Sequence, residues 1–402
     1  MNHDVIITGR GCVTALGQDI AAFENAIFAG VSGIGDISDI DDGIVFRNGA
    51  PVRAFKPEDH FDKRDLNMLD VFSQFAAVAA RQAWTESGLT SSRVDPARIA
   101  VIVGTANGGQ DVLNVGYRRL LVDHAKRPSP MTIPMTMASA PASRISREIG
   151  ATGPVFGVTS ACASSAHAMI QALAMVRSGL VDVAVTGGAD SCFCLGYLRA
   201  WDATRVVSPD TCRPFSRDRK GMIIGEGAGA IVIESRRHAE ARGAAPLAVL
   251  AGGGMSSSAH NFVGSDEAGL AQVMRAALAD AGLRPEDVDY INAHGTGTRA
   301  NDAAEAAAIL SVFGLKAKAP AVSSTKSMHG HAMGAAGAIE LLATIAALRH
   351  GKIPPTINFT EPDPECDIDV TPNACRERTV RVAISNSFAF GGLNAALVVR
   401  RE

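Results

Sequence analysis

The chain has 402 residues, of which 47% are hydrophobic and 20% charged, and its formal net charge is -3. This is the composition of an ordinary globular protein with enough apolar material for two domains or one large double domain. The near-neutral charge argues against a nucleic-acid binder, which is usually basic overall. Seven cysteines without paired spacing, and an N-terminus without a basic segment and a long apolar run, predict no signal peptide and no membrane span. We therefore expect a reducing compartment, by default the cytoplasm.

Along the chain, short apolar runs closed by glycines predict strands, and apolar residues at three- and four-residue spacing predict helices. Strands are expected at residues 5–9, 99–104, 154–158, 182–188 and 288–293, and helices at residues 20–28, 69–87, 163–178 and 332–348. Residues 30–61, with scattered Asp, Gly and Pro, predict loops. The loop 105–109 lacks the glycine fingerprint of a dinucleotide site.

Two parts of this pattern occur twice. Residues 222–234 and 382–399 each predict a strand, a glycine-rich turn and a second strand. The strand and polar loop of residues 99–109 return at residues 288–295. We therefore predict an internal duplication of two α/β halves. The predicted halves are residues 1–245 and 246–402.

Cys162 lies between a predicted strand and a predicted helix. A helix N-terminus offers unpaired N–H groups and a positive dipole end, which favour a thiolate. A sharp turn at that place also lifts the side chain clear of the backbone, as in other nucleophile elbows. We interpret Cys162 as a covalent nucleophile, with a buried structural thiol as the alternative. Cys192 and Cys194 have no second pair at metal-ligand spacing and are expected in the core or an interface.

His294 follows a buried strand, so its imidazole is expected at the carboxyl end of the sheet, where α/β sites form. The helix after it carries Asp302 and Glu305 on one face, which we expect to be solvated or paired with distant cations. His167 lies five residues after Cys162, which turns it away on a helix, so it is expected in the core or an interface.

His329 and His331 precede a helix whose start is unusually rich in small residues. In a regular strand both would face one side, but an irregular turn at Gly330 would separate them, and the sequence alone does not choose. A metal site would need further ligands, and none stands at useful spacing. No metal is therefore expected.

The whole constellation is one Cys, two His on separate loops, Lys326 and the helix residue Glu340. A Cys protease would need a Cys-His-Asn or Cys-His-Asp arrangement. Two His and a Lys instead indicate stabilisation of a developing enolate, because neutral imidazoles can donate hydrogen bonds to a thioester carbonyl as charge builds there. A Lys–Glu pair could hold the charge state of such a network.

These motifs resemble the β-ketoacyl-acyl-carrier-protein synthases, in particular the elongating type II ketosynthases that use Cys-His-His. The matching segments, in family order along nearly the whole chain, are residues 5–9, 158–163, 213–215, 225–228, 294–298, 324–327, 330–331 and 388–394. Within that family, residues 327–331 and 388–394 are similar to the rhizobial nodulation-type ketosynthases, which make unusual, unsaturated acyl chains.

The resemblance implies a thiolase-type, five-layered αβαβα fold of two duplicated halves, in a homodimer or a heterodimer. It implies a decarboxylative Claisen condensation that gives 3-oxoacyl-acyl carrier protein. Cys162 would take an acyl group from acyl carrier protein. His294 and His331 would hold the malonyl thioester carbonyl while carbon dioxide leaves. The backbone N–H groups of Cys162 and Phe390 would form the oxyanion hole. The chain would need no cofactor of its own, because the carrier protein delivers the phosphopantetheine arm.

The resemblance also implies supporting roles. Lys326 and Glu340 would support the two histidines, and Phe390 would act as a gate. The residues expected to contact the phosphopantetheine arm or to give the gate loop freedom are Thr296, Thr298, Gly391 and Gly392. The alternatives are ordinary: the threonines would cap a helix and Phe390 would belong to the core.

Some positions depart from the family pattern. Asn107 stands where an apolar residue usually lines the acyl pocket, and a polar group there penalises a long saturated tail unless it is hydrogen-bonded. We hypothesise that Asn107 alters acyl-chain acceptance. Ser258 stands where Asp is common, Leu393 where Thr is common, and Ala389 where Gly is usual.

Acyl carrier proteins are acidic, so docking requires a local basic cluster on this mildly acidic chain. The candidate docking residues are Lys63, Arg64, Arg219 and Lys220. One rival to an active ketosynthase is a non-condensing chain-length partner subunit, which typically lacks the nucleophile. A degradative thiolase would need a second Cys near the C-terminus, where this chain has Phe390.

Overall fold

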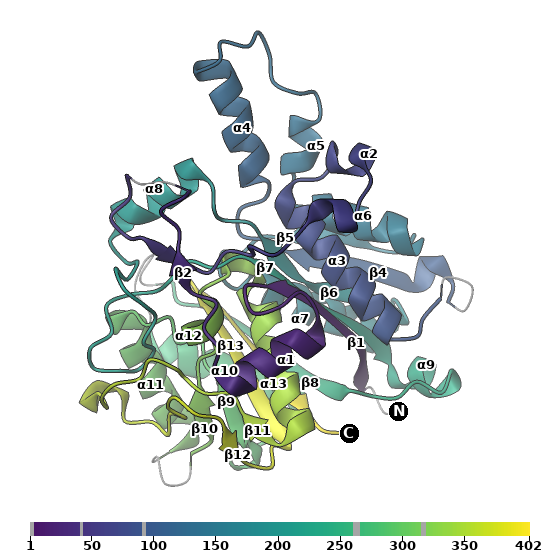
Figure 1. Ribbon diagram of the computed structural model, residues 1–402. Coiled ribbons are helices and arrows are strands. Elements are labelled where there is room, and N and C mark those ends of the chain that lie inside the picture. Colours follow the sequence, from purple (N-terminus) through teal and green to yellow (C-terminus); the bar gives the residue numbers. More distant parts are fainter. Residues whose placement is uncertain (1–3, 41–42, 91–93, 260–265, 315–318) are drawn as a thin grey trace.

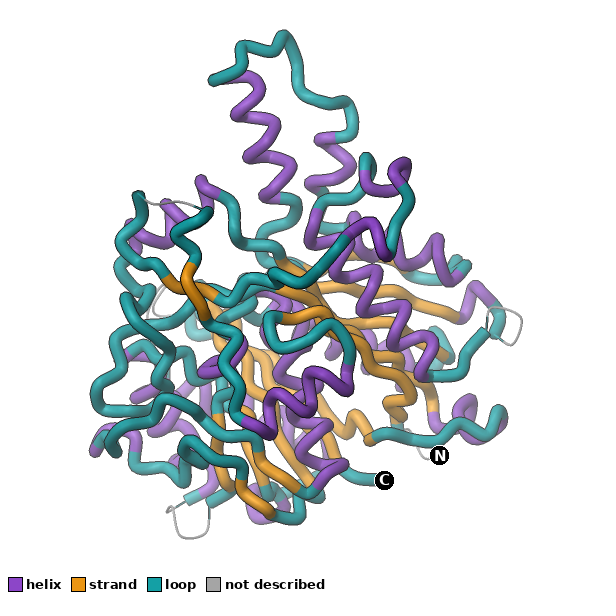
Figure 2. Tube along the Cα trace, viewed as in Figure 1, coloured by secondary structure: helices purple, strands orange, loops and turns teal. Residues whose placement is uncertain are grey.

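Strands run through the middle of the protein (Figure 2). They form one mixed sheet in the order β10-β9-β13-β14-β8-β1-β7-β6-β4-β5. The computed structural model describes residues 4–40, 43–90, 94–259, 266–314 and 319–402. The sheet strands are β1 (Val5–Thr14), β4 (Ile99–Gly104), β5 (Val155–Val158), β6 (Val183–Asp190), β7 (Gly227–Ser235), β8 (Ala248–Ser257), β9 (Tyr290–Asn292), β10 (Ala321–Ser323), β13 (Val382–Ala389) and β14 (Leu393–Arg400). Two small ribbons pair β2 (Gly35–Asp36) with β3 (Asn48–Gly49), and β11 (Lys352–Ile353) with β12 (Arg376–Glu377).

The sheet consists of two halves with the same topology. From either end towards the middle, two parallel pairings are followed by two antiparallel ones, in the orders β5-β4-β6-β7-β1 and β10-β9-β13-β14-β8. The halves join through the antiparallel contact of β1 with β8, where Ile6 faces Val249. The strand at residues 99–104 therefore corresponds to the strand of the second half that precedes His294. This repeat confirms the predicted duplicated fold.

One part of the predicted repeat was wrong. Residues 222–234 do not form a strand, a turn and a second strand: β7 is one strand, and its antiparallel partners are β1 and β6, both earlier in the chain. The segment before β7 forms only isolated bridges, of which one joins Ile224 to His331. In this segment, the Glu226 carboxylate accepts hydrogen bonds from the N–H groups of Val52 (2.9 Å) and Cys192 (3.3 Å). These residues leave the sheet because they are bound to loops around the site described below.

Helices form the other three layers (Figure 1). A central layer lies between the two halves of the sheet, and its residues form a large part of the main hydrophobic core. The central helices are α7 (Ser164–Arg177) and α13 (Ala336–His350). The outer face of the first half is covered by α3 (Val71–Glu86) and α6 (Ala140–Ile149), and that of the second half by α10 (Glu267–Ala281) and α11 (Arg299–Phe313). The five-layered arrangement expected from the resemblance is thus present.

Further helices lie in the connections. They are α1 (Ile20–Ala29), α2 (Lys63–Leu66), α4 (Gln110–Leu121), α5 (Thr132–Thr136), α8 (Leu195–Thr204), α9 (Arg236–Ala241) and α12 (Lys326–His329). Asp19 caps α1, because its carboxylate accepts the Ala22 N–H at 2.8 Å. In the part of the chain that the structure describes, no helix combines the length and apolar character that crossing a bilayer requires. The prediction that no signal peptide is present rests partly on residues 1–3, which lie outside that part.

The first strand is longer than predicted. It was expected to end at Gly9, yet β1 continues through Gly9 and Gly11 to Thr14. The reason is the close approach of α3. A Cβ added to Gly9 would lie 1.9 Å from the Ala83 carbonyl oxygen, and one added to Gly11 would lie 2.0 Å from that of Ala79. These glycines allow a helix to pack directly on the strand backbone.

Gly9→Ala is therefore expected to destabilise the protein by roughly 1–3 kcal/mol or more, because the helix must move away from the strand. Gly35→Ala is the matched control, since an added Cβ there meets nothing within 4 Å. Urea unfolding of both variants and the wild type measures the difference. Equal unfolding free energies for the two variants would contradict this account of the packing.

Candidate active site

Cys162 lies in a tight turn between β5 and the start of α7. The preceding Ala161 has a left-handed φ of 49°, a conformation that side-chain-bearing residues seldom adopt. The Ser164 hydroxyl holds the turn, because it donates to the Ala161 carbonyl at 2.6 Å and accepts the Ser160 N–H at 2.9 Å. The turn presents the Cys162 side chain at the helix N-terminus, which is the predicted elbow. His167 contacts the Ser160 hydroxyl at 2.6 Å.

The electrostatics of Cys162 differ from the expectation. Burial raises the pKa of the thiol to about 11, while the positive charge of Lys326 and the backbone N–H of Phe390 act in the opposite direction without cancelling it. Only 8% of the residue is exposed. The helix N-terminus therefore does not produce a resting thiolate, because the cost of desolvating the charge is larger. The resting group is a thiol.

Glu305, on α11, fixes the loop that carries His294. The Glu305 carboxylate accepts the N–H groups of His294 and Gly295, each at 2.8 Å. Glu305 was predicted to be solvated or paired with distant cations, and that was wrong: it is fully buried, and burial raises its pKa to about 7. Asp302 is also fully buried. Its carboxylate is paired with a cation distant in sequence, Arg219, whose Nε lies 3.7 Å away.

The structure shows that His329 and His331 point to different places, a question that the sequence left open. Gly330, with φ of 67°, ends α12 and turns the chain between them. His329 is held in the interior, because its Nδ1 donates to the Gly330 carbonyl at 2.8 Å and its Nε2 accepts from the Thr325 hydroxyl at 3.0 Å. His331 instead faces the pocket that contains Cys162.

The protonation pattern of His331 follows from its hydrogen bonds. Its Nδ1 accepts the Met333 N–H at 3.2 Å, so the ring proton of the neutral imidazole lies on Nε2. This Nε2 is buried and has no hydrogen-bond partner among the described residues. An unpaired buried donor is costly unless a ligand satisfies it. His331 therefore presents an unused N–H to the pocket.

His294 also presents its Nε2–H to the pocket. The Lys326 ammonium donates to His294 Nδ1 at 3.2 Å, which again leaves the imidazole proton on Nε2. The centroids of the two imidazole rings lie 5.3 Å apart, at 85° to each other. Burial, and then the nearby charge of Lys326, lower the pKa of both rings well below the ordinary value. Both are therefore neutral donors at physiological pH.

A buried ion pair supports this arrangement. Lys326 also donates to the Glu340 carboxylate, which comes from the central helix α13. Both side chains are fully buried, and burial raises the pKa of Glu340 to about 7. Breaking such a pair would leave an uncompensated charge in the interior. The pair thus fixes the Lys326 ammonium beside His294 Nδ1.

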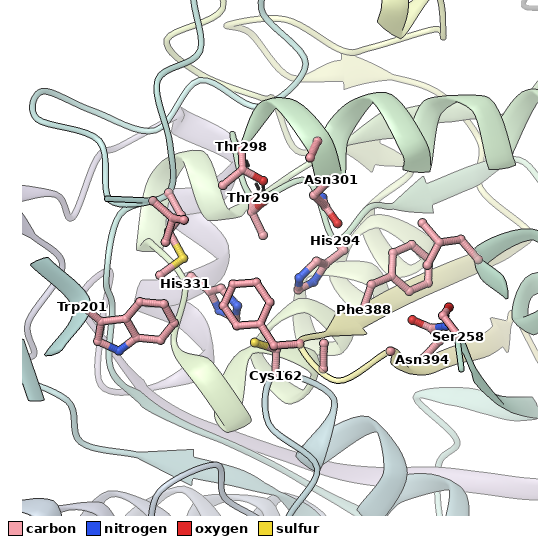
Figure 3. A pocket seen from close by; sticks show the side chains of 17 residues that line it. Cys162, Trp201, Ser258, His294, Thr296, Thr298, Asn301, His331, Phe388 and Asn394 are labelled. Carbon is pink, nitrogen blue, oxygen red and sulfur yellow. Dashed lines mark hydrogen bonds between the residues drawn. The ribbon is translucent and has the colours of Figure 1, made fainter. Parts of the chain in front are cut away.

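Cys162, His294 and His331 line one pocket, together with residues predicted to bind the substrate arm (Figure 3). The hydroxyls of Thr296 and Thr298 lie 2.9 Å apart at its wall. Thr298 is the N-cap of α11 but makes no side-chain capping bond, so the capping alternative is not observed for it.

The predicted gate lies on the hairpin turn between β13 and β14. Phe390 lines the pocket and is 42% exposed, so it does not belong to the core. Gly391 and Gly392 both have left-handed φ angles, of 85° and 72°. Asn107 is not among the residues that line this pocket; its amide donates to the Tyr197 hydroxyl at 2.7 Å.

The predicted docking residues fall into two groups. Lys63 and Arg64 are exposed on α2. The prediction that Arg219 is a docking residue was wrong. Only 1% of this residue is exposed, and its guanidinium donates to Asp363 and to the Arg299 carbonyl. Lys220 is exposed but forms an ion pair with Asp210 at 3.0 Å.

The sequence reasoning missed two residues that line the pocket and one that holds loops beside it. Trp201 on α8 and Phe388 on β13 line the pocket, and Phe388 lies against the His294 ring. Asp190, at the end of β6, accepts hydrogen bonds from Ala106 at 2.9 Å and Gly334 at 2.6 Å, which ties two loops together. No periodicity or motif marks Trp201, although it is one of only two tryptophans.

Two family models match this chain: the β-ketoacyl synthase N-terminal domain over residues 2–239 and the C-terminal domain over residues 247–360. The chain belongs to the β-ketoacyl synthase family. A relative that is 47% identical over the full length of both chains is Nodulation protein E of Rhizobium sp. (strain N33). The 3-oxoacyl-[acyl-carrier-protein] synthase 2 of Staphylococcus aureus (strain COL) is 37% identical over all of this chain and 99% of its own.

Solved structures agree with this membership. The ishigamide ketosynthase/chain length factor superposes with a TM-score of 0.95 at 36% identity, over 99% of each chain. A β-ketoacyl synthase from Burkholderia phymatum STM815 gives a TM-score of 0.93 at 30% identity, again over 99% of each. A type II polyketide ketosynthase in complex with its acyl-carrier protein gives 0.91 at 29% identity and the same coverage. The protein is therefore a condensing ketosynthase of thiolase-type fold.

The influence of the buried ion pair on the nucleophile can be measured. In the double variant Lys326→Met/Glu340→Gln, Cys162 loses the positive charge that lowers its pKa, so the pKa rises. Each unit of increase lowers the thiolate fraction about tenfold. Iodoacetamide alkylation of Cys162, followed by intact mass at about pH 8.5, should become slower.

The control for this measurement is Cys162→Ala, which reports the alkylation of the other cysteines. Removing both partners of the ion pair together avoids leaving a single buried charge. Alkylation of Cys162 that is unchanged or faster in the double variant would contradict the proposed effect of Lys326.

Proposed function

We propose that this ketosynthase condenses an acyl group on Cys162 with malonyl-acyl carrier protein, releasing carbon dioxide and 3-oxoacyl-acyl carrier protein. The observation that carries the proposal is the convergence of one thiol and two Nε2–H donors, those of His294 and His331, on one pocket. A non-condensing chain-length subunit would not need this set. The presence of all three groups therefore favours an active condensing enzyme.

In the first half-reaction, the Cys162 sulfur attacks the thioester carbonyl of an acyl carrier protein. A new S–C bond forms, the carrier's sulfur leaves, and the proton of Cys162 ends on that departing thiol. Negative charge on the carbonyl oxygen of the tetrahedral intermediate is held by the backbone N–H groups of Cys162 and Phe390. The same Phe390 N–H and the Lys326 charge stabilise the thiolate as it develops.

In the second half-reaction, the malonyl thioester carbonyl accepts hydrogen bonds from His294 and His331. As the C–C bond to the carboxylate breaks, carbon dioxide leaves and the electron pair passes into an enolate, whose oxygen charge the two donors stabilise. The carbanion carbon then attacks the acyl-Cys162 carbonyl, the thiolate of Cys162 leaves, and a proton from water restores the resting thiol. Neutral imidazoles suit this role, because their protons stay in place while charge builds beside them.

The carrier protein is proposed to dock near α2 and to insert its phosphopantetheine arm past Thr296 and Thr298. The paired hydroxyls of the threonines offer hydrogen bonds to the amide groups of such an arm. Lys63 and Arg64 offer exposed positive charge to an acidic carrier. No resident cofactor is part of this proposal, since the arm belongs to the substrate. We place the reaction in the cytoplasm, because all seven cysteines are free.

We further propose that the chain acts as a homodimer. The arm formed by α4 and α5 projects from the first half (Figure 1) and exposes large apolar side chains. They include Tyr117 (58% exposed), Leu121 (74%), Val122 (64%) and Ile133 (66%). Such a concentration of exposed apolar groups is typical of an interface. A heterodimer with a chain-length partner is the alternative, since one structural relative is a ketosynthase/chain length factor.

The two half-reactions are separable by mutation. Cys162→Ala is expected to abolish the acyl-enzyme and condensation but to retain decarboxylation of malonyl carrier protein, because both Nε2–H donors remain. His331→Ala is expected to retain acylation of Cys162 and to slow decarboxylation by roughly 100-fold. Intact-mass measurement of the acyl-enzyme and carbon dioxide release distinguish the two. Loss of acylation in His331→Ala, with the fold intact, would contradict the assigned roles.

The docking proposal is tested by charge reversal. Lys63→Glu/Arg64→Glu is expected to raise KM for carrier protein about tenfold or more and to reduce its salt dependence, with kcat little changed. Arg237→Glu is the control, because this side chain is 85% exposed on α9; its reversal changes the net charge by half as much. If both variants changed KM equally, the effect would be one of overall charge and docking at α2 would be rejected.

A further inference from the structure

His167, on α7, is a titratable side chain that no step of the proposed reaction uses. It is half-buried, and it does not line the pocket that contains Cys162. Its two ring nitrogens nevertheless have separate partners. Nδ1 lies 2.6 Å from the Ser160 hydroxyl, and Nε2 lies 3.4 Å from the Asn394 carbonyl oxygen. His167 therefore joins the elbow after β5 to the second residue of β14.

The direction of the two hydrogen bonds follows from the chemistry of the partners. A carbonyl oxygen can only accept, so the ring proton lies on Nε2, which faces Asn394. Nδ1 is then the acceptor, and the Ser160 hydroxyl donates to it. Burial lowers the pKa of His167, although the Asn394 carbonyl acts in the opposite direction, so the ring is neutral at physiological pH. One neutral ring thus makes both hydrogen bonds at once.

Ser160 belongs to the turn that carries Cys162. The Ser160 carbonyl accepts the Ala163 N–H at 3.1 Å, so these two residues close the turn. Inside the turn, Ala161 has the left-handed φ of 49°. Such a strained backbone conformation persists only where the surrounding contacts hold it. The hydrogen bond from Ser160 to His167 is one of these contacts, so a change at His167 reaches the Cys162 N–H through the turn.

Asn394 belongs to the hairpin that carries Phe390. Asn394 pairs with Phe388 across the hairpin, and its amide donates to the Ser258 hydroxyl at 2.9 Å. The backbone N–H groups of Phe390 and Cys162 both form hydrogen bonds to the Cys162 sulfur. Two N–H groups from elements far apart in the chain therefore meet at one atom. The relative position of the elbow and the hairpin decides whether they do.

We propose that His167 is a positioning residue for the oxyanion hole, because its ring ties together the elbow and the hairpin, which supply one N–H each. His167 with its partners Ser160 and Asn394 is named the His167 bridge. This inference rests on the proposed function, since the oxyanion hole acts when Cys162 is acylated. Two donors stabilise a tetrahedral intermediate fully only when both lie within hydrogen-bond reach of the same oxygen.

The test compares acylation of Cys162 with decarboxylation of malonyl carrier protein. His167→Phe keeps a ring but makes neither hydrogen bond, and it is expected to slow acylation by roughly 10- to 100-fold. Acylation is followed by intact mass with hexanoyl or hexadecanoyl carrier protein, whichever acylates the wild type faster. Decarboxylation should stay within about twofold of wild type, because its two imidazole donors are held by Lys326 and the Met333 N–H. A general loss of structure would lower both rates together.

Two further variants test the hydrogen bonds themselves. His167→Gln supplies one donor and one acceptor, so it should be acylated faster than His167→Phe. Ser160→Ala removes one hydrogen bond of the bridge and should slow acylation less than His167→Phe does. The double variant Ser160→Ala/His167→Phe should be no slower than His167→Phe, because both changes break the same contact.

His350→Phe is the matched control. His350 is an exposed histidine that contacts Glu24 at 3.0 Å and does not line the pocket. Its replacement should change neither acylation nor decarboxylation. Ser160→Ala covers the case in which His167→Phe does not fold, through the same comparison of the two rates.

Alkylation of Cys162 supplies a readout that needs no ketosynthase activity. Moving the Phe390 N–H away from the sulfur raises the pKa of Cys162. Iodoacetamide at about pH 8.5 should therefore alkylate Cys162 more slowly in His167→Phe than in the wild type. Cys162→Ala again reports the alkylation of the other cysteines.

The outcomes separate the two levels of the account. A wild-type protein that is never acylated on Cys162 would reject the proposed function, and the alkylation rates would still decide the role of His167. A wild type that is acylated, with His167→Phe acylated at the same rate, would reject the His167 bridge alone. Equal slowing of acylation and decarboxylation, or His167→Gln no faster than His167→Phe, would also reject it.

Discussion

The structure depends on the burial of ionisable groups around one pocket. Burial keeps the His294 and His331 imidazoles neutral, and each ring has its Nδ1 occupied by a fixed hydrogen bond. The proton of each is therefore on the nitrogen that faces the pocket. The same burial raises the pKa of Cys162, so the enzyme rests as a thiol and stabilises negative charge only where the reaction creates it. Preorganised donors of this kind need no rearrangement during the reaction.

The duplicated fold makes that pocket possible. The parallel strands of both halves end at the same region of the protein. The elbow after β5 and the loop after β9 therefore meet there, although Cys162 and His294 are far apart in the chain. The central helices supply the rest: α7 presents its N-terminus at the nucleophile, and α13 contributes Glu340 from within the core. Buried carboxylates such as Glu305 then fix the loops by accepting backbone N–H groups.

Much of this was predictable from the sequence, because strand-end motifs and small-residue helices have strong local signals. The elbow at Cys162 and the strand before His294 are examples. Burial of polar residues was not predictable. Glu305 and Arg219 have the composition of a solvated surface, and only the tertiary fold shows that backbone amides and carboxylates satisfy them. The predicted strand pairing of residues 222–234 was also wrong, because a local glycine pattern does not reveal partners that lie earlier in the chain, in β1 and β6.

The central claim is that both active-site imidazoles are neutral with the proton on Nε2. Nitrogen-15 NMR of the labelled imidazoles, assigned with single His variants, measures this directly. We predict that the His294 and His331 signals keep the shifts of the neutral Nε2–H tautomer between about pH 8 and pH 5.5, because the pKa of each lies well below the ordinary value. Titration of either ring near pH 6.5, or a proton on Nδ1, would contradict the account.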